Sequence, residues 1–492
     1  MTAPDSQVLH YERPSAGVSA APGRRSLMPG ALALVVLSSG VAIGQPIEIR
    51  PGVLVPEVAA KEEPGQTYAL YLPSAYDPGR KWPALYAFDP MARGSVPIEC
   101  YREAAEEHGF IVVASNVSRN GPMAPSLRAG IAVIRDSALR FSIDERRLYA
   151  TGFSGGARVA CALAHGLGGS IAAVVGSGAG FPQDLRPSAD TPFAFCGTIG
   201  DEDFNWTEMN QLERTLESLG KPHRLLRFHG GHVWPPNDVA RRAVEWLELL
   251  AMRTGTRTPD AVLVERLLHQ DLERAEAQES AGALREAWSG YADIAAAFRG
   301  LTDVKPFDAK VAALRSHALV RKQLKREKDE EDDEVRQSAT ISQLVGQLSD
   351  PELRVDSASQ IRTTIAVLKR EEKDASSPSK RLLARRLLEH VSITAYYAAQ
   401  PLSEAGDHES ARRCLELQAA VHPESAAVQY RLALNYAQAG DKKKAVESLK
   451  SAAAKGFWDV ARVEKESAFE RLRGDPHFLR VLEEIRANKK PS

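Results

Sequence analysis

Apolar and polar positions alternate along the first half of the chain as they do in a sheet covered by helices. From about residue 65, short apolar runs are separated by segments with helical spacing. This alternation predicts βαβ units and a doubly wound, mostly parallel sheet, because strands buried on both faces consist of continuous apolar runs. The predicted strands are 68–72, 84–88, 110–114, 147–151, 171–175, 193–196 and 224–228, and the predicted helices are 100–108, 125–140, 156–166, 207–220 and 238–252.

After about residue 254 the pattern changes to helical periodicity alone. Strand patterns end there, and Ala, Leu, Glu, Lys and Arg predominate. Helices are expected around 261–274, 308–324 and 380–389, and the charged run 325–334 is predicted to be a solvated helix face or a linker. The predicted fold class is therefore α/β, followed by an all-α domain.

A segment of the helical half repeats after 34 residues, from Tyr396 to Tyr430. Glycine permits a tight interhelical turn, and alanine lets two helices approach closely. Gly282 and Ala287 keep the same offset and indicate a weaker, earlier copy. The period resembles the tetratricopeptide repeat, although the tryptophan of that family is absent. The first copy has Tyr396, Ala399, Ala405, Gly406, Asp407, Ala411 and Leu415, and the second has Tyr430, Ala433, Ala439, Gly440, Asp441, Ala445 and Leu449.

The N-terminal segment, residues 1–45, is predicted to be disordered and to end in an export signal. Arg24 and Arg25 precede the apolar stretch 31–37 and then small residues, which is the form of a secretory signal with cleavage near Ala42 or Gly44. The apolar stretch is shorter than the roughly 20 residues of a membrane span, so we expect no stable membrane span. Export to the periplasm or the exterior follows as an expectation.

Two alternatives to an ordinary cleaved signal remain open. The paired arginines also resemble a twin-arginine export signal. Met28 could instead be the true start of the chain. The remaining residues divide into a predicted α/β domain, 46–253, and a helical domain, 254–492.

Composition excludes several classes of partner and cofactor. A length of 492 residues with 43% hydrophobic residues indicates two or three domains with large cores, and a net charge of −1 predicts no nucleic-acid partner. The four cysteines are far apart and form no CxxC pair, so we expect no metal site and no cofactor. Buried, apolar cysteines are predicted, with a disulfide from Cys161 to Cys100 or to Cys196 as the alternative.

The chemistry-bearing motif is Gly152-Phe153-Ser154-Gly155-Gly156, which lies between a predicted strand and a predicted helix. This is a GxSxG sequence in the strand–turn–helix context of a nucleophile elbow. The serine hydroxyl would project from a strained turn, and the flanking glycines would avoid collisions with neighbouring backbone. The amides at the start of the following helix would face a developing oxyanion.

On this motif, residues 60–252 resemble the α/β-hydrolase family, especially compact esterases similar to polyhydroxybutyrate-depolymerase-like and feruloyl-esterase-like enzymes. The Tyr68-to-Pro73 segment and the Gly231-His232 pair extend the resemblance. It implies a catalytic serine, acid and histidine in that order along the chain.

The histidine is predicted to be His232, in the loop that follows the last strand, with His229 as the alternative. A metal-binding role for this His-x-x-His pair is a third reading, although no further ligands flank it. The acid is predicted to be Asp203, three residues after Gly200, and Asp201 is its alternative.

The oxyanion hole is predicted to use the amides of Gly155 and Met91. The family's second donor follows the strand that ends at Phe88, but here Pro90 has no amide proton, so the donor moves to Met91 or a near neighbour. Only residues 176–191 separate two later strands, too few for a lid domain.

These residues predict a serine hydrolase that cleaves carboxylic esters through an acyl-enzyme. The substrate would be an ester or acylated small molecule or polymer outside the cytoplasm, and the helical repeats would offer a surface for a protein partner. A peptidase or acyltransferase with the same residues is the nearest alternative. An interaction scaffold with a degenerate hydrolase fold is the alternative from a different class.

Overall fold

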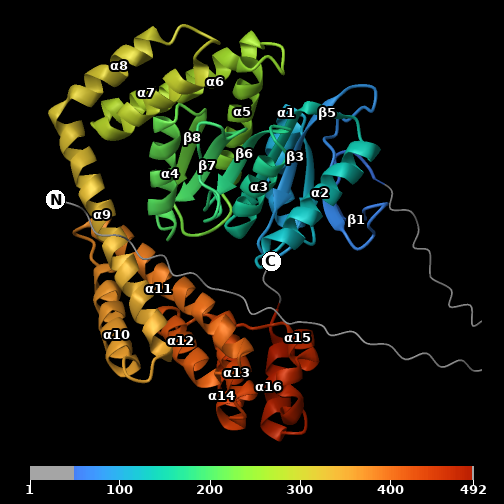
Figure 1. The fold of residues 1–492 in the computed structure, drawn as a ribbon, viewed down its shortest axis with the longest axis vertical. Coiled ribbons are helices and arrows are strands. Elements are labelled where there is room, and N and C mark those ends of the chain that lie inside the picture. Colours follow the sequence, from blue (N-terminus) through green and yellow to red (C-terminus); the bar gives the residue numbers. More distant parts are fainter. Residues whose placement is uncertain (1–48, 490–492) are drawn as a thin grey trace, which may run out of the picture. The chain divides into compact units, whose positions relative to one another are not determined.

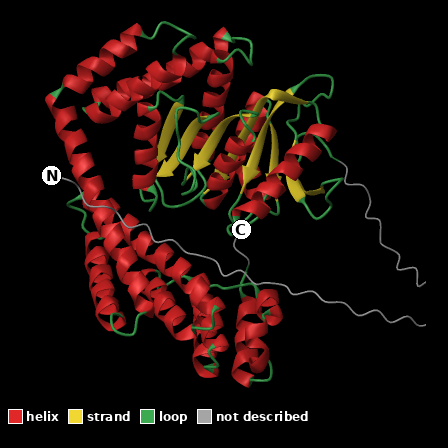
Figure 2. Cartoon of the chain, in the orientation of Figure 1, coloured by secondary structure: helices red, strands yellow, loops and turns green. Residues whose placement is uncertain are grey.

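The structure is a computed structural model that describes residues 49–489, so the predicted export signal lies outside the described residues. These residues form an eight-stranded sheet with helices on both faces, followed by a long series of helices (Figure 1, Figure 2). The predicted fold class, a doubly wound and mostly parallel sheet followed by an all-α region, is confirmed. Within the described range, the helices are all too short or too polar to cross a membrane.

The strands follow the order β1-β2-β4-β3-β5-β6-β7-β8 across the sheet. β2 is antiparallel to both β1 and β4, and the remaining neighbours are parallel. The carboxyl ends of the parallel strands therefore lie along one edge, where ligand sites form in such sheets. The strands are β1 Val55–Ala59, β2 Thr67–Tyr71, β3 Trp82–Phe88, β4 Ile111–Ser115, β5 Ile143–Phe153, β6 Ile171–Ser177, β7 Ala194–Gly200 and β8 His223–Phe228.

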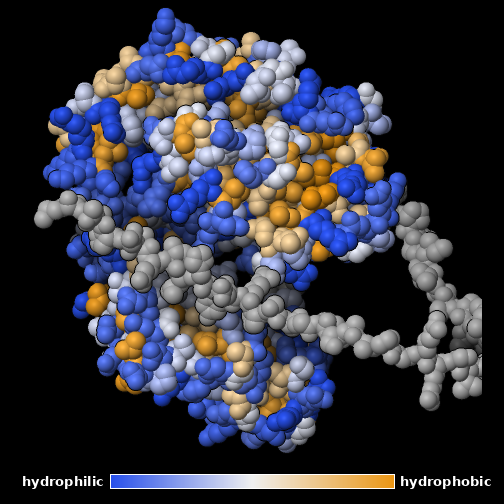
Figure 3. Space-filling model, viewed as in Figure 1, coloured by the Kyte–Doolittle hydropathy of each residue, from blue (hydrophilic) through white to orange (hydrophobic). Residues whose placement is uncertain are grey.

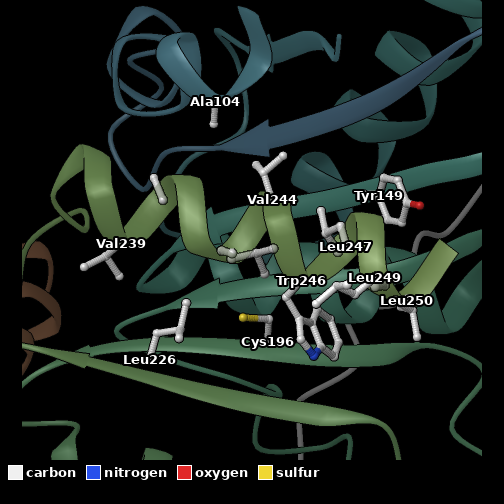
Figure 4. Close-up of a cluster of buried hydrophobic side chains, with 14 of the residues drawn as sticks. Ala104, Tyr149, Cys196, Leu226, Val239, Val244, Trp246, Leu247, Leu249 and Leu250 are labelled. Carbon is white, nitrogen blue, oxygen red and sulfur yellow. The ribbon is translucent and has the colours of Figure 1, made fainter. Parts of the chain in front are cut away.

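Two hydrophobic clusters cover the two faces of the sheet. Helices α1 (Ser95–His108) and α5 (Asn237–Arg253) supply one cluster, which Figure 4 shows with Trp246 of α5 and Cys196 of β7. Helices α2 (Met123–Arg140), α3 (Gly155–Gly166) and α4 (Trp206–Ser218) supply the other. Alternate residues of β3 face opposite clusters, which explains why that strand is apolar throughout.

Each predicted strand and helix of the first half corresponds to an element of the structure. The sequence did not predict β1, an edge strand in which only Val55 and Val58 are buried and whose pairing is interrupted by a register shift. Two apolar residues separated by polar ones give too little alternation to indicate a strand.

The second half contains helices α6 to α16 and two short 3₁₀ helices. They are α6 Ala261–Ser280, α7 Leu284–Phe298, α8 Lys305–Ser316, α9 Ala318–Gly346, η1 Gln347–Ser349, α10 Arg354–Glu371, α11 Pro378–Glu404, α12 His408–Val421, α13 Ala426–Gln438, α14 Lys442–Ala454, α15 Val460–Lys465, η2 Ser467–Leu472 and α16 Pro476–Ala487.

The single helix predicted over 308–324 is wrong, because the chain breaks between α8 and α9. His317 has an extended backbone, and its side-chain Nδ1 accepts a hydrogen bond from the amide of Leu319. A histidine is not among the usual N-cap residues, so the sequence did not indicate this boundary. The charged run 325–334 lies within α9. Hydrophilic residues predominate on the face of the whole molecule drawn in Figure 3.

The repeated segments form two helix pairs, α11 with α12 and α13 with α14. Gly406 and Gly440 occupy the turns with φ values of 79° and 81°, and Ala411 and Ala445 are fully buried. Asp407 and Asp441 are the N-caps of α12 and α14, and each side chain accepts a hydrogen bond from the amide three residues later. The two copies therefore share one local geometry, while their assignment as tetratricopeptide repeats stays a prediction.

The hydrophobic cluster on the α5 face continues into the next three helices. Leu267 of α6 and Ile294 of α7 belong to the same cluster as the strands, and so does Leu314 of α8. The boundary predicted at 253/254 thus cuts through a continuous core, and the domain limits stay predictions.

The four cysteines are buried and free, in agreement with their predicted apolar role. Burial raises the pKa of the Cys100 thiol to about 12 and that of Cys414 to about 11. Thiols with such pKa values are poor nucleophiles at neutral pH.

Candidate active site

Ser154 lies in a sharp turn between β5 and α3. Its φ of 53° and ψ of −121° put it in a region that side-chain-bearing residues rarely adopt. The turn is held by a hydrogen bond from the Ser154 amide to the carbonyl of Ser177 at 2.8 Å. The strained serine thus stands at the carboxyl edge of the sheet, at the start of a helix.

The glycines around Ser154 are required by close contacts with backbone. A Cβ atom at Gly152 would lie 2.2 Å from the carbonyl carbon of Gly156, and one at Gly156 would lie 2.0 Å from the carbonyl oxygen of Phe88. Both distances are far below van der Waals contact, so a side chain at Gly152 would open the turn itself and one at Gly156 would push the turn away from β3. This is the physical reason for glycine on both sides of the serine.

His232 and Asp203 form a close and mostly buried pair at the same edge. Nδ1 of His232 lies 2.8 Å from Oδ2 and 2.9 Å from Oδ1 of Asp203. The side chains are 18% and 1% exposed, respectively. An ionised carboxylate only accepts hydrogen bonds, so Nδ1 carries the proton and Nε2 keeps a free lone pair.

Aromatic rings and a tight glycine keep this pair beside the serine turn. The His232 ring lies 4.5 Å from the ring of Phe153 and 4.3 Å from that of Phe204, measured between centroids. Gly178, with a φ of 63°, leaves room for both: a Cβ there would lie 3.0 Å from Oδ2 of Asp203 and 3.1 Å from Cε1 of His232. The histidine therefore lies against the residue that precedes Ser154.

The alternative residues, His229 and Asp201, form a second pair on the same two loops. Nδ1 of His229 lies 3.0 Å from Oδ2 of Asp201, but the histidine side chain is 80% exposed. The hydrogen bond to Asp201, together with the charge of Asp201, raises the pKa of His229. The two pairs differ in burial and in contact with Phe153, and both differences favour His232 and Asp203.

The loop after β3 is organised around the buried carboxylate of Asp89. It accepts hydrogen bonds from the Met91 amide at 2.8 Å, from Arg93 Nε at 3.0 Å and Nη2 at 2.9 Å, and from Trp234 Nε1 at 3.0 Å. Burial by itself would raise the pKa of Asp89, but the hydrogen bonds from Arg93, Trp234 and Met91 outweigh it and lower that pKa. The predicted donor Met91 thus directs its amide at Asp89.

Helix α11 of the helical half contacts the loop that carries Asp203. Arg386 donates from Nη1 to the carbonyl oxygen of Asp201 at 2.9 Å, and its guanidinium lies 5.6 Å from the ring centroid of Trp206. The same guanidinium makes a bidentate pair with buried Glu334 of α9, at 2.9 and 2.7 Å. Arg385 pairs with Glu202 one residue further along the loop.

The same helix also reaches the other side of the serine turn. The Tyr397 hydroxyl lies 3.2 Å from Nδ2 of Asn120, and the Asn120 side chain lies directly against Gly155. Helix α11 therefore contacts residues on both sides of Ser154.

Two groups of side chains offer three ligand atoms within 4.8 Å among the described residues. They are Asp201 with Glu202 and His229, and Glu107 with His108 and Glu245. Arginines already pair with carboxylates in both groups, through Arg385 in the first and through Arg241 and Arg266 in the second. A metal ion at either site would therefore compete with an arginine for at least one carboxylate.

Three features together define the α/β-hydrolase fold. They are the strand order, the antiparallel pairings of β2 with β1 and β4 at one edge of the sheet, and the strained serine after β5. The element order runs from β6 directly to β7, so no helical lid interrupts the sheet there among the described residues.

The sequence matches no protein-family model and no curated protein. Among solved structures, S-formylglutathione hydrolase (FrmB) from Staphylococcus aureus is 14% identical, with a TM-score of 0.32 over 41% of this chain and 99% of that chain. A ferulic acid esterase is 14% identical, with a TM-score of 0.32 over 40% and 97%. The esterase Est2 of Thermogutta terrifontis is 13% identical, with a TM-score of 0.33 over 42% and 96%.

Three residues of this region were not singled out in the sequence. Asp89 could have been noticed, because a polar residue that directly follows a buried strand lies at the functional edge of the sheet. Asn120 lies in an irregular loop, and Arg386 is one of several arginines on a long helix, so neither carries a sequence signal.

Proposed function

We propose that this protein is a serine hydrolase that cleaves carboxylic esters with Ser154 as nucleophile, His232 as general base and Asp203 as the residue that orients the histidine. The observation that carries the proposal is the mostly buried Asp203–His232 hydrogen bond at 2.8 Å, next to a serine whose backbone is strained. Such a combination is typical of nucleophilic catalysis by an activated hydroxyl group.

In the first half of the reaction, Oγ of Ser154 attacks the ester carbonyl carbon while Nε2 of His232 takes the hydroxyl proton. The carbonyl oxygen becomes an oxyanion, which the Gly155 amide stabilises at the start of α3. The carbon–oxygen bond to the alcohol then breaks, and the alcohol leaves with the proton from His232.

In the second half, water attacks the acyl-enzyme. His232 takes a proton from the water and returns it to Oγ of Ser154 as the carboxylic acid forms. Asp203 stays ionised and stabilises the imidazolium that arises in each step.

The proposed substrate is an ester or acylated small molecule or polymer outside the cytoplasm. Direct succession of β6 and β7 supports access for bulky polar acyl or alcohol groups, since no lid is inserted there. Export rests on the N-terminal residues alone. A protein partner for the helical repeats stays a prediction.

The test is hydrolysis of short nitrophenyl esters, acetylated xylan and feruloylated sugars by the purified full chain. We expect turnover of at least one ester, and we expect Ser154→Ala to remove it while the protein remains folded. Turnover that survives the substitution would overturn the assignment of the nucleophile.

A further inference from the structure

The backbone amides of residues 91–94, in the loop after β3, all donate to groups of the protein itself. Pro90 has no amide proton, the Met91 amide donates to Oδ1 of Asp89 at 2.8 Å, and the Ala92 amide donates to the Asp89 carbonyl at 3.1 Å. The Arg93 amide donates to Oδ1 of Asp89 at 3.4 Å, and the Gly94 amide donates to Oδ1 of Asn116 at 3.1 Å. The usual source of the second oxyanion donor is therefore occupied.

Neighbouring side chains stabilise the hydrogen bond from the Met91 amide to Asp89. Asp89 is 0% exposed, and Arg93 and Trp234 fix both of its oxygens. Turning the Met91 amide toward a substrate would leave a buried carboxylate with one donor fewer. It would also place an oxyanion close to that carboxylate, which is electrostatically unfavourable.

The side chain of Asn120 lies against Gly155, whose amide is the first predicted donor. A Cβ atom at Gly155 would lie 1.9 Å from Oδ1 and 3.6 Å from Nδ2 of Asn120, so the carboxamide touches the residue after the nucleophile. The backbone amide of Asn120 donates to the carbonyl of Pro90 at 2.8 Å, and this hydrogen bond ties the backbone of Asn120 to the loop after β3. Asn120 is also exposed, so a substrate can reach it.

We propose that the Asn120 carboxamide, together with the Gly155 amide, forms the oxyanion hole in place of Met91. This inference rests on the proposed function. Nδ2 faces Tyr397 at 3.2 Å, and a half-turn of the carboxamide exchanges its two ends. The tyrosine hydroxyl accepts from Nδ2 in one orientation and donates to Oδ1 in the other, so this partner is kept in both. The negative charge that develops on the substrate favours the orientation with Nδ2 toward Gly155.

Tyr397 is then a positioning residue supplied by the helical half. The residue is 48% exposed, and its ring lies beside that of Tyr396, with ring centroids 5.3 Å apart. Its hydroxyl bonds the end of the Asn120 carboxamide that faces away from Gly155, and so it holds the carboxamide in place in either orientation. Helix α11 thereby takes part in ester cleavage through Asn120.

The test compares Asn120→Ala, Asn120→Asp and Tyr397→Phe with the full-length parent chain. We expect Asn120→Ala to lower kcat by about 10²–10³-fold with KM within about threefold, because a lost oxyanion donor acts in the transition state. Asn120→Asp keeps the shape but replaces the donor with a carboxylate, so kcat falls at least as far. Tyr397→Phe lowers kcat by about tenfold, since it removes one hydrogen bond to the carboxamide.

Asn116→Ala is the matched control, since Asn116 holds Gly94 of the β3 loop and lies four residues before Asn120. It should lower the thermal midpoint but leave kcat within about threefold. A second readout is the ratio of kcat/KM for nitrophenyl acetate and its thionoester, in which sulfur replaces the carbonyl oxygen. Sulfur accepts hydrogen bonds weakly, so this ratio should fall toward unity in Asn120→Ala and stay at the parental value in Asn116→Ala.

Unchanged kcat and an unchanged thionoester ratio in folded Asn120→Ala would overturn the inference, and so would a large loss in Asn116→Ala alone. Either result would leave the proposed function intact if the parent chain still hydrolyses esters through Ser154. Absence of any turnover that depends on Ser154 would instead overturn the proposed function itself.

Discussion

Two histidine–aspartate pairs lie on the loops after β7 and β8, and they differ mainly in burial. Asp203 is 1% exposed beside His232, whereas His229 is 80% exposed beside Asp201. We expect His232→Gln and Asp203→Asn to lower kcat by about 10³–10⁴-fold. The first variant removes the general base, and the second favours the wrong tautomer of His232. Steady-state kinetics on one nitrophenyl ester measures the effect.

The exposed pair supplies the matched controls. His229→Gln and Asp201→Asn should stay within about threefold of the parent in kcat, since solvent already screens that pair. Larger losses of kcat from substitutions in the exposed pair than in the buried pair would identify His229, and not His232, as the general base.

Asp89 makes the stability of the protein depend on pH. Folding lowers its pKa, so the ionised carboxylate stabilises the fold above the ordinary aspartate pKa of about 3.9, and this contribution is lost as the pH falls toward the folded-state pKa. Asp89→Asn should cost about 2 kcal/mol at pH 7, because hydrogen bonds from Arg93 and Trp234 lose their charged acceptor. Urea unfolding between pH 7 and pH 3 should show a smaller pH dependence in the variant. An equal dependence in both proteins would show that Asp89 does not cause it.

The buried ion pair between α9 and α11 supports the loop that carries Asp203. Arg386→Met leaves Glu334 buried without its partner and should cost about 3–5 kcal/mol of stability. It also removes the donor to the Asp201 carbonyl, so kcat should fall by about tenfold, while KM changes little.

The double variant Arg386→Met with Glu334→Leu separates stability from activity. Replacing both charges with apolar groups should restore most of the unfolding free energy, because no buried charge is left unpaired. The kcat should stay low, since the hydrogen bond to Asp201 is still absent. Full recovery of kcat in a stable double variant would mean that Arg386 has no positioning role.

The core on the α5 face of the sheet extends into α6, α7 and α8 of the helical half. Leu267, Ile294 and Leu314 share this cluster with Trp246, and a buried side chain of this kind contributes about 1.5–3 kcal/mol. A chain cut after residue 253 should therefore be insoluble or poorly folded, whereas a chain cut after residue 316 should unfold cooperatively. Thermal unfolding of the two truncated chains tests this, and a stable first chain would support the boundary predicted at 253/254.

The sequence predicted the parts of this molecule that depend on local pattern. Continuous apolar strands, helical spacing and the glycines around Ser154 are all properties of short segments, and the sheet followed from them. The edge strand β1 was missed because its two buried valines depend on pairing with β2. The break at His317 was missed because an unusual residue caps α9.

The residues around the site that were missed are those whose contacts join distant segments. Asp89 meets Trp234 across 145 positions of the chain, and Asn120 meets Tyr397 across 277. A single sequence carries no record of such pairs, because each partner is an ordinary polar or aromatic residue in its own segment. His232 and Asp203 could be placed in advance only because each follows a recognisable strand.

The mass of the intact chain after treatment with a fluorophosphonate, followed by peptide mapping, tests whether Ser154 is the nucleophile. We expect one adduct per chain on Ser154, no adduct in Ser154→Ala, and slow formation in His232→Gln. A folded parent chain that gains no adduct, or that gains it on another serine, would rule out Ser154 as the nucleophile and favour an interaction scaffold on a degenerate hydrolase fold.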